Sequence, residues 1–298
     1  MATFTSGDVT IAYDDIGPRE GGRPIVLLHG FASNRNENWR RLGWYGAFER
    51  KNIRFIAPDM RGHGESSKPH EPQAYTREKL VGDVFALLDH LDIAKADVMG
   101  FSMGTRTAMG AALADPKRVD LLILGGIGGR LFEPPLAGNP MAAAMEAEKI
   151  DDISEPLLKS FRQFADEQGE DRLALAALTR APYSPFTREM VSQIANETLV
   201  VAGSRDVLAG DPGELARAMP NAKAVTLPGC DHFSAIAHAL FKAAVFDFLD
   251  GTLESSGWSN TDAEPDQRKL PLRSGNVRDH GQDRPCRAMP LLEMPQSL

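Results

Sequence analysis

The stretch Gly100-Phe101-Ser102-Met103-Gly104 lies between a short apolar run, Ala96–Met99, and a run of small residues, Thr105–Ala114. The apolar run predicts a buried strand, and the small residues predict a helix that packs closely on it. A serine on such a sharp strand-to-helix turn is held in a strained backbone conformation, with its hydroxyl exposed at the edge of the sheet. The glycines two positions before and after it avoid collisions with the neighbouring strand and helix. In this context the G-x-S-x-G motif indicates a nucleophilic serine.

Composition limits the class of protein. The chain has 298 residues, 42% of them hydrophobic, which suffices for one large domain or two small ones. Its formal net charge of −8 and its pI near 5.4 argue against nucleic acid and anionic membrane surfaces as partners. The two cysteines, Cys230 and Cys286, provide neither a disulfide framework nor a metal site. Because the start lacks the pattern of a signal peptide and no apolar run reaches membrane-spanning length, we expect a cytoplasmic protein.

Strand-like and helical patterns alternate along most of the chain. Strands are predicted at Val9–Tyr13, Pro24–Leu28, Ile53–Ala57, Ala96–Met99, Val119–Leu124, Thr198–Ala202 and Ala224–Leu227. The spacing of apolar residues predicts helices over Thr76–Leu91 and Ser234–Leu249. This alternation predicts an α/β protein with a mostly parallel sheet and helices on both faces.

Two segments break the alternation. Between Ile127 and Ile194 no strand is predicted, and amphipathic stretches punctuated by prolines predict a helical insertion at the carboxyl edge of the sheet. After Leu253 the sequence shows neither helical nor strand periodicity, and its composition predicts low order. We therefore expect a core of residues 1–126 and 195–253, a helical cap of residues 127–194, and a C-terminal tail of residues 254–298 without a catalytic role.

A serine hydroxyl needs a base to remove its proton, and the base needs a third group to hold its tautomer. Asp206 comes just after the predicted strand Thr198–Ala202, and His232 follows the strand that ends at Leu227. In an open parallel sheet the reactive groups gather outside the carboxyl ends of the strands, which is where both residues and Ser102 fall. The order Ser, Asp, His therefore predicts a catalytic triad.

Other acids and histidines compete for these roles. Asp231 adjoins His232 in the sequence and is poorly placed to orient its ring, and Asp120 begins a strand instead of ending one. Of the seven histidines, only His232 combines a strand end with a position beyond the acid.

The oxyanion of acyl transfer needs two backbone N–H donors. Met103, the residue after the nucleophile, is expected to provide one of them from the start of a helix. The other is expected from Phe31, because Gly30 in the loop after the strand Pro24–Leu28 would let the backbone turn so that this N–H points into the site.

Five motifs together carry a resemblance to a known family. They are Leu27–Phe31, Pro58–Ser66, Gly100–Gly104, Gly203–Asp206 and Gly229–Phe233. In this order they resemble the α/β-hydrolase superfamily over residues 9–250. The resemblance implies an eight-stranded sheet and a helical cap inserted after the sixth strand. It also implies that residues 59–66 form a structural turn, so that Arg61 and His63 are not expected to be catalytic.

The residue type at position 102, on the predicted strand-to-helix turn, excludes several reactions known for the superfamily. The epoxide hydrolases and haloalkane dehalogenases of the superfamily have Asp where this chain has Ser102, and its dienelactone hydrolases have Cys. Epoxide activation also uses two cap tyrosines, and the insertion contains only Tyr183. Glycine-rich Gly125–Gly129 fits neither a dinucleotide fingerprint nor a P-loop, so no cofactor is expected.

The sequence thus predicts a serine hydrolase that cleaves small to medium hydrophobic esters or lactones through an acyl-enzyme. Thioester hydrolysis, carbon–carbon bond hydrolysis, acyl transfer and cofactor-free peroxidase chemistry on the same triad remain open alternatives. A ligand-binding protein with little turnover also remains open, although it would have no need for a complete triad. The substrate's identity and the oligomeric state do not follow from the sequence.

Overall fold

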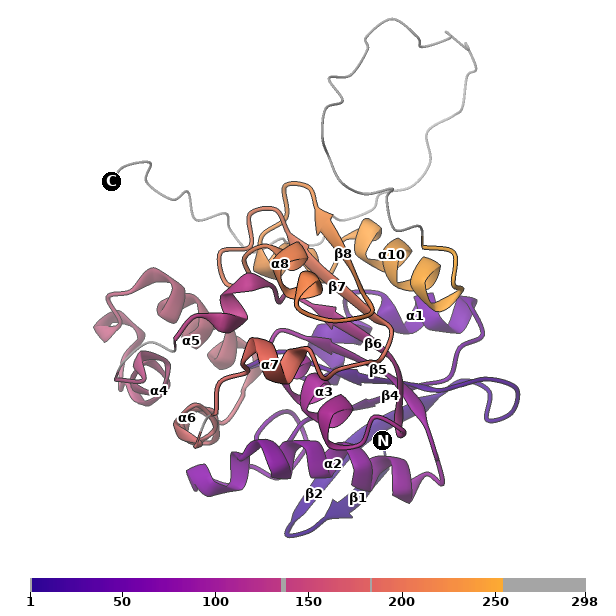
Figure 1. Cartoon of the computed structure of the whole chain (residues 1–298). Helices are drawn as coiled ribbons and strands as arrows, with labels where there is room; N and C mark the ends of the chain where they lie inside the picture. The colour runs from indigo at the N-terminus through magenta and orange to yellow at the C-terminus, as the bar shows by residue number, and fades with distance from the viewer. Residues whose placement is uncertain (1, 135–137, 183, 254–298) are drawn as a thin grey trace, which may run out of the picture. The chain divides into compact units, whose positions relative to one another are not determined.

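The computed structural model describes residues 2–134, 138–182 and 184–253. The predicted C-terminal tail of residues 254–298 therefore lies outside the described residues, as does Tyr183. Figure 1 shows the described chain as a central sheet flanked by helices. No helix among the described residues has both the length and the apolar character needed to cross a bilayer.

The sheet has eight strands in the order β1-β2-β4-β3-β5-β6-β7-β8. Their bounds are β1 Ala2–Ser6, β2 Val9–Ile16, β3 Ile25–Leu28, β4 Phe55–Pro58, β5 Ala96–Phe101, β6 Val119–Gly125, β7 Thr198–Gly203 and β8 Ala222–Leu227. Strand β2 pairs antiparallel with β1 and β4, and all the other pairs are parallel. The mostly parallel, eight-stranded α/β sheet expected from the sequence is confirmed.

Ten α-helices are described, together with four short turns of other helix types. The α-helices are α1 Trp44–Arg50, α2 Arg77–His90, α3 Met103–Ala114, α4 Pro140–Glu146, α5 Pro156–Gln168, α6 Arg172–Arg180, α7 Arg188–Val191, α8 Pro212–Arg217, α9 His232–Ala235 and α10 Ala239–Leu249. A π-helical turn spans Asn36–Arg40, and 3₁₀ turns span Pro72–Tyr75, Gly129–Phe132 and Ile150–Asp152. Helices α4–α6 follow β6, so the helical segment predicted after the sixth strand is confirmed.

Successive residues of the central strands alternate between two faces of the sheet. Val26 of β3 and Val98 of β5 belong to a buried cluster with residues of α2, α3 and α8. Their neighbours Leu27 and Met99 belong to a second buried cluster with residues of α1 and α10. Figure 1 accordingly shows α2 and α3 on one side of the sheet and α1 and α10 on the other. Burial on both faces explains why these strands are continuously apolar in sequence.

The last helical segment differs from the single helix predicted over Ser234–Leu249. Helix α9 begins earlier, at His232, because Asp231 caps it and makes a capping box with Ser234. The chain then leaves the helix at Ile236, whose carbonyl accepts a hydrogen bond from Trp44 Nε1 at 2.8 Å. His238 caps α10 by accepting the N–H of Leu240 at 3.2 Å. Side chains at the break thus supply the bonds that a continuous helix would have made within its backbone.

Candidate active site

Ser102 lies at the turn between β5 and α3, where its backbone angles are φ 52° and ψ −112°. Its N–H donates to Gly125 O at 2.8 Å, so the start of α3 is tied to the end of β6. The flanking glycines permit close approach: a Cβ on Gly104 would lie 2.1 Å from Leu28 O, and one on Gly100 would lie 2.5 Å from Gly104 backbone atoms. The turn therefore has the strained strand-to-helix geometry that the pentapeptide predicts.

Ser102, His232 and Asp206 meet at the carboxyl edge of the sheet. The distance from His232 Nε2 to Ser102 Oγ is 2.9 Å, and His232 Nδ1 lies 2.9 Å from Asp206 Oδ2. Because a carboxylate only accepts, Nδ1 carries the imidazole proton and Nε2 is left to accept the serine hydroxyl. His232 is 7% exposed and Asp206 is 4% exposed. The structure thus brings together the three residues that the sequence selects.

The loops after β7 and β8 position Asp206 and His232 relative to each other. Asp206 Oδ1 accepts the N–H groups of Leu208 and Ala209 at 3.0 and 2.9 Å, which fixes the carboxylate. A Cβ on Gly203 would lie 2.1 Å from Cys230 O, so the two loops approach as closely as only glycine allows. Asp231, the neighbour of His232, serves as the cap of α9 and is not the group that orients the imidazole.

The two expected oxyanion donors, Met103 and Phe31, come from α3 and from the loop after β3. Met103 is the first residue of α3, and Phe31 follows β3, whose end packs on Gly104. Among the described residues, neither N–H donates to a loop carbonyl or to a side chain. The backbone turn differs from the expectation, because the positive φ of 57° belongs to Ala32 and not to Gly30. A Cβ on Gly30 would make only ordinary contacts of 3.6 Å.

A model of the α/β-hydrolase fold family matches residues 23–173, which is just over half of the chain. The chain belongs to the α/β-hydrolase fold family. Its eight-stranded topology and the helical segment after β6 agree with this assignment.

Relatives of this α/β-hydrolase have several activities. A dihydrolipoyllysine-residue acetyltransferase component of an acetoin cleaving system from Pseudomonas putida is 34% identical over 72% of this chain, which spans 59% of that protein. A 2-hydroxymuconate semialdehyde hydrolase from Pseudomonas sp. (strain CF600) is 31% identical over 76% of this chain and 87% of that protein. The crystal structure of an enol-lactonase from Burkholderia xenovorans LB400 superposes with a TM-score of 0.68, at 26% identity over 84% of this chain and all of that one.

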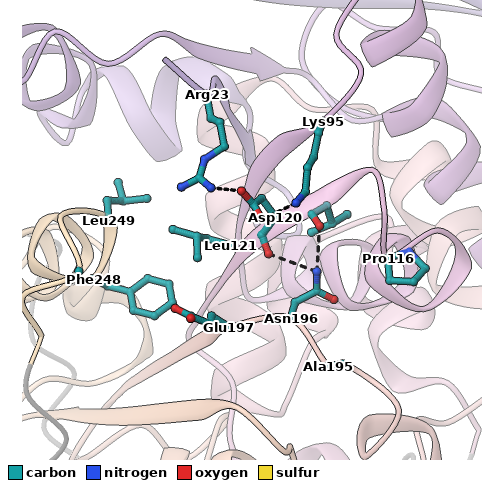
Figure 2. A pocket seen from close by; sticks show the side chains of 12 residues that line it. Arg23, Lys95, Pro116, Asp120, Leu121, Ala195, Asn196, Glu197, Phe248 and Leu249 are labelled. Carbon is teal, nitrogen blue, oxygen red and sulfur yellow. Dashed lines mark hydrogen bonds and ion pairs between the residues drawn. The ribbon is translucent and has the colours of Figure 1, made fainter. Parts of the chain in front are cut away.

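Asp120, the competing acid, lies far from the triad of this α/β-hydrolase along the strand direction. It stands at the amino end of β6, where Lys95 Nζ lies 2.6 Å from its carboxylate and Arg23 also binds it. Figure 2 shows these three side chains in the wall of a cavity of about 510 Å³, together with Asn196. Since both cations neutralise Asp120 there, this residue does not orient His232. No group of residues suited to hold a metal ion is found in the described part of the chain.

Aromatic rings connect the helical segment of this α/β-hydrolase to the triad. Phe161 of α5 lies 6.0 Å from the ring of Phe31 and 5.5 Å from that of Phe233. The ring of Phe233 in turn lies 5.8 Å from His232. Phe31 also packs against a buried cluster of the segment, which includes Met145. The chain therefore places apolar surface next to the imidazole and the loop after β3.

Two buried histidines, His29 and His63, form a pair that the sequence analysis does not predict, although it assigns His63 to a structural turn. His29 and His63 are fully buried, and their rings pack edge to face 4.9 Å apart. Burial lowers the pKa of His63 to about 4, and burial, followed by the neighbouring His63, lowers the pKa of His29 well below its usual value. Both are therefore neutral imidazoles at neutral pH. Their positions next to glycines in recurring motifs were the only sequence signal for them.

Proposed function

We propose that this α/β-hydrolase is a serine esterase that cleaves small to medium hydrophobic esters or lactones through an acyl-enzyme. The observation that carries the proposal is the 2.9 Å contact between His232 Nε2 and Ser102 Oγ, with Nδ1 held by the buried Asp206. A serine so placed has the general base that its activation requires.

In the proposed mechanism, Ser102 Oγ forms a bond to the ester carbonyl carbon while His232 Nε2 takes the hydroxyl proton. The N–H groups of Phe31 and Met103 stabilise the oxyanion of the tetrahedral intermediate. The carbon–oxygen bond to the alcohol then breaks, and His232 returns the proton to the leaving alcohol. Water attacks the acyl-enzyme by the same steps in reverse, which releases the acid and restores Ser102.

Two features near the triad favour a substrate without charged groups: aromatic side chains beside His232, and arginines that are already paired. Phe31, Phe161 and Phe233 supply aromatic surface beside His232. Each of the five arginines of residues 127–194 pairs with a carboxylate. These pairs are Arg130–Glu133, Arg162–Asp166, Arg172–Asp166, Arg180–Glu146 and Arg188–Glu214. These guanidinium groups are therefore engaged within the protein, which favours hydrophobic acyl groups over acidic ones.

A panel of p-nitrophenyl esters from acetate to octanoate tests the proposal, with Ser102→Ala as the control. We expect hydrolysis by the native protein and a loss of at least about 10⁴-fold in kcat for the variant. Labelling by a fluorophosphonate should occur at Ser102 in the native protein only. Absence of both hydrolysis and labelling would contradict the proposal and favour a ligand-binding protein with little turnover.

Carbon–carbon bond hydrolysis is the second candidate, because the relative from Pseudomonas sp. (strain CF600) is named a 2-hydroxymuconate semialdehyde hydrolase. Its named substrate is a carboxylate, whereas the insertion arginines of this chain are already paired. We therefore expect kcat/KM for 2-hydroxymuconate semialdehyde to be below that for p-nitrophenyl butyrate. The reverse order, measured by loss of the dienol absorbance, would make this second candidate the better description.

A further inference from the structure

Between Gly30 and Ser33 in the loop after β3, the backbone N–H groups donate to fixed acceptors, with the exception of Phe31. Gly30 N–H donates to Asn38 Oδ1 at 3.1 Å, and Ala32 N–H donates to His63 Nε2 at 3.2 Å. Ser33 N–H donates to Gly30 O at 3.3 Å. Within the described structure, the N–H of Phe31 remains without such an acceptor. Within the stretch Gly30–Ser33, one N–H is therefore available for an oxyanion.

The bond from Ala32 to His63 holds the strained position of this loop. Ala32 has a φ of 57°, a left-handed conformation that costs free energy for any residue with a Cβ. The N–H of Ala32 belongs to the Phe31–Ala32 peptide, so its bond to His63 fixes the plane of that peptide. The Gly30–Phe31 peptide, which carries the Phe31 N–H, directly precedes it in the chain. Without an acceptor at this point, relaxation of Ala32 would rotate the adjoining Phe31–Ala32 peptide plane.

The tautomer of His63 is fixed by its second hydrogen bond. Nδ1 lies 3.2 Å from Arg61 O, and because a carbonyl only accepts, Nδ1 carries the proton. Nε2 is consequently a lone-pair acceptor aimed at Ala32 N–H. His29 has the same arrangement, since its Nδ1 donates to Gly30 O at 2.8 Å and its Nε2 accepts Met60 N–H at 2.9 Å. The charged side chains that act on this pair of rings are Lys68 on His63 and Arg35 on His29, and both disfavour the protonated form.

We propose that His63 is a positioning residue for the oxyanion hole, which it sets by accepting Ala32 N–H so that Phe31 N–H faces the reacting carbonyl. The proposal rests on the proposed esterase function of Ser102. It gives a role in the reaction to a residue that the sequence motif alone presents as part of a structural turn. His63 touches neither the substrate nor Ser102 and acts only through the loop.

Two amide variants test the role of the Nε2 acceptor. In His63→Gln the side-chain carbonyl extends to about where Nε2 lies, whereas in His63→Asn it reaches only the position of Nδ1. We expect His63→Asn to lower kcat for p-nitrophenyl butyrate about 10- to 100-fold with little change in KM, because loss of an oxyanion-hole donor itself costs about 10²–10³-fold. His63→Gln should recover at least half of this loss on a logarithmic scale.

A thionoester gives a readout that a loss of stability would not change. Sulfur accepts hydrogen bonds more weakly than oxygen, so an intact oxyanion hole makes the oxoester react faster than the matched thionoester. We expect this preference to shrink in His63→Asn and to return in His63→Gln. The matched control is Ser66→Ala in the same loop, which removes the bonds of Ser66 Oγ with Ala12 N–H and Asp59 O. It should lower the melting temperature and leave the preference unchanged.

The outcomes separate the two proposals. Equal kcat and equal oxoester preference in His63→Gln, His63→Asn and the native protein would overturn the role of His63 and leave the esterase function intact. A native protein that neither hydrolyses esters nor labels with a fluorophosphonate would overturn the esterase function itself. If His63→Asn does not fold, His63→Leu, which fills the same space without an acceptor, takes its place. A smaller oxoester preference in His63→Leu than in His63→Gln supports the role, and equal preferences in the two variants contradict it.

Discussion

Ser102, the proposed nucleophile, has a strained backbone conformation. Its φ of 52° and ψ of −112° fall in a region that glycine adopts readily and residues with a Cβ do not. The bond from its N–H to Gly125 O and the close packing of Gly104 on Leu28 hold it in place. Stability is therefore lost at the residue where the hydroxyl must be exposed to a substrate.

Replacement of Ser102 by glycine should consequently stabilise the fold. We expect Ser102→Gly to unfold with a free energy about 1 kcal/mol higher than Ser102→Ala, because relief of about 1–3 kcal/mol of strain exceeds the added entropy of glycine in the unfolded chain. Urea denaturation at pH 7 measures the difference, and both variants lack the hydroxyl, so activity does not confound it. Equal stability of the two variants would show that the backbone at this turn is not strained.

His63 should make stability depend on pH in the acid range. Its pKa is about 4 in the folded protein, against an ordinary value of 6.5, so the folded state binds fewer protons than the unfolded chain between these values. The stabilisation is complete above pH 6.5 and is lost as the pH falls through this range. The free energy of unfolding should therefore fall by about 2–3 kcal/mol more between pH 7.5 and 4.5 in the native protein than in His63→Gln.

The comparison with His63→Gln removes the contributions of groups whose pKa does not depend on His63, and it reports on His63 together with its neighbour His29. Burial raises the pKa values of Asp59, Asp97 and Glu170, and raised carboxyl pKa values act on stability in the opposite direction. These contributions are common to both proteins and cancel in the difference. Parallel pH profiles of unfolding would show that His63 is protonated equally in the folded and unfolded states.

At the scale of elements, the central strands were predictable because burial on both faces leaves a continuous apolar signal. The elements that were missed have weaker signals: β1 is a short edge strand, and α1 and α8 are helices of seven and six residues. The break between α9 and α10 depends on Trp44, which binds Ile236 O from 192 residues away in the sequence. The spacing of apolar residues over a short stretch of sequence cannot reveal a contact with a residue so far away in the chain.

In the candidate site, too, the residues that follow strands were predictable from the sequence, and the contacts between loops were not. Ser102, Asp206 and His232 each follow a recognisable strand, so the sheet's topology alone brings them to one edge. The contact between His63 and Ala32 joins two loops, and the positive φ at Ala32 has no glycine to mark it. Loop conformations set by a distant side chain leave no local pattern in the sequence.

Helix α5 should determine how much space the acyl group has. Phe161, at 8% exposure, fills the region between Phe31 and Phe233. We expect Phe161→Leu to raise the ratio of kcat/KM for p-nitrophenyl octanoate to that for the butyrate about tenfold, because the smaller side chain admits additional methylene groups. Leu173→Ala, at a residue of α6 that is 53% exposed, is the matched control and should leave the ratio unchanged. An unchanged ratio in Phe161→Leu would place the acyl group elsewhere.

At the scale of the molecule, the two edges of the sheet carry different groups of polar residues. The carboxyl edge holds Ser102, Asp206 and His232, whereas the amino edge holds Asp120 paired with Arg23 and Lys95 (Figure 2). Parallel strands impose this division, since all their carboxyl ends meet at one edge. Every residue of the proposed mechanism lies before Leu253.

A chain that ends at Leu253 should therefore retain the proposed activity. Leu253 is 4% exposed, its N–H donates to Asp247 O at 3.0 Å, and its carbonyl accepts a bond from Lys223, so the chain after α10 is held against the core up to this residue. We expect residues 1–253 to match the full chain in kcat/KM for p-nitrophenyl butyrate and in urea midpoint. The control ends at Phe246, which removes Asp247 and the buried Phe248, and it should fail to fold. Loss of ester hydrolysis in residues 1–253, with an unchanged urea midpoint, would mean that the site requires residues beyond Leu253.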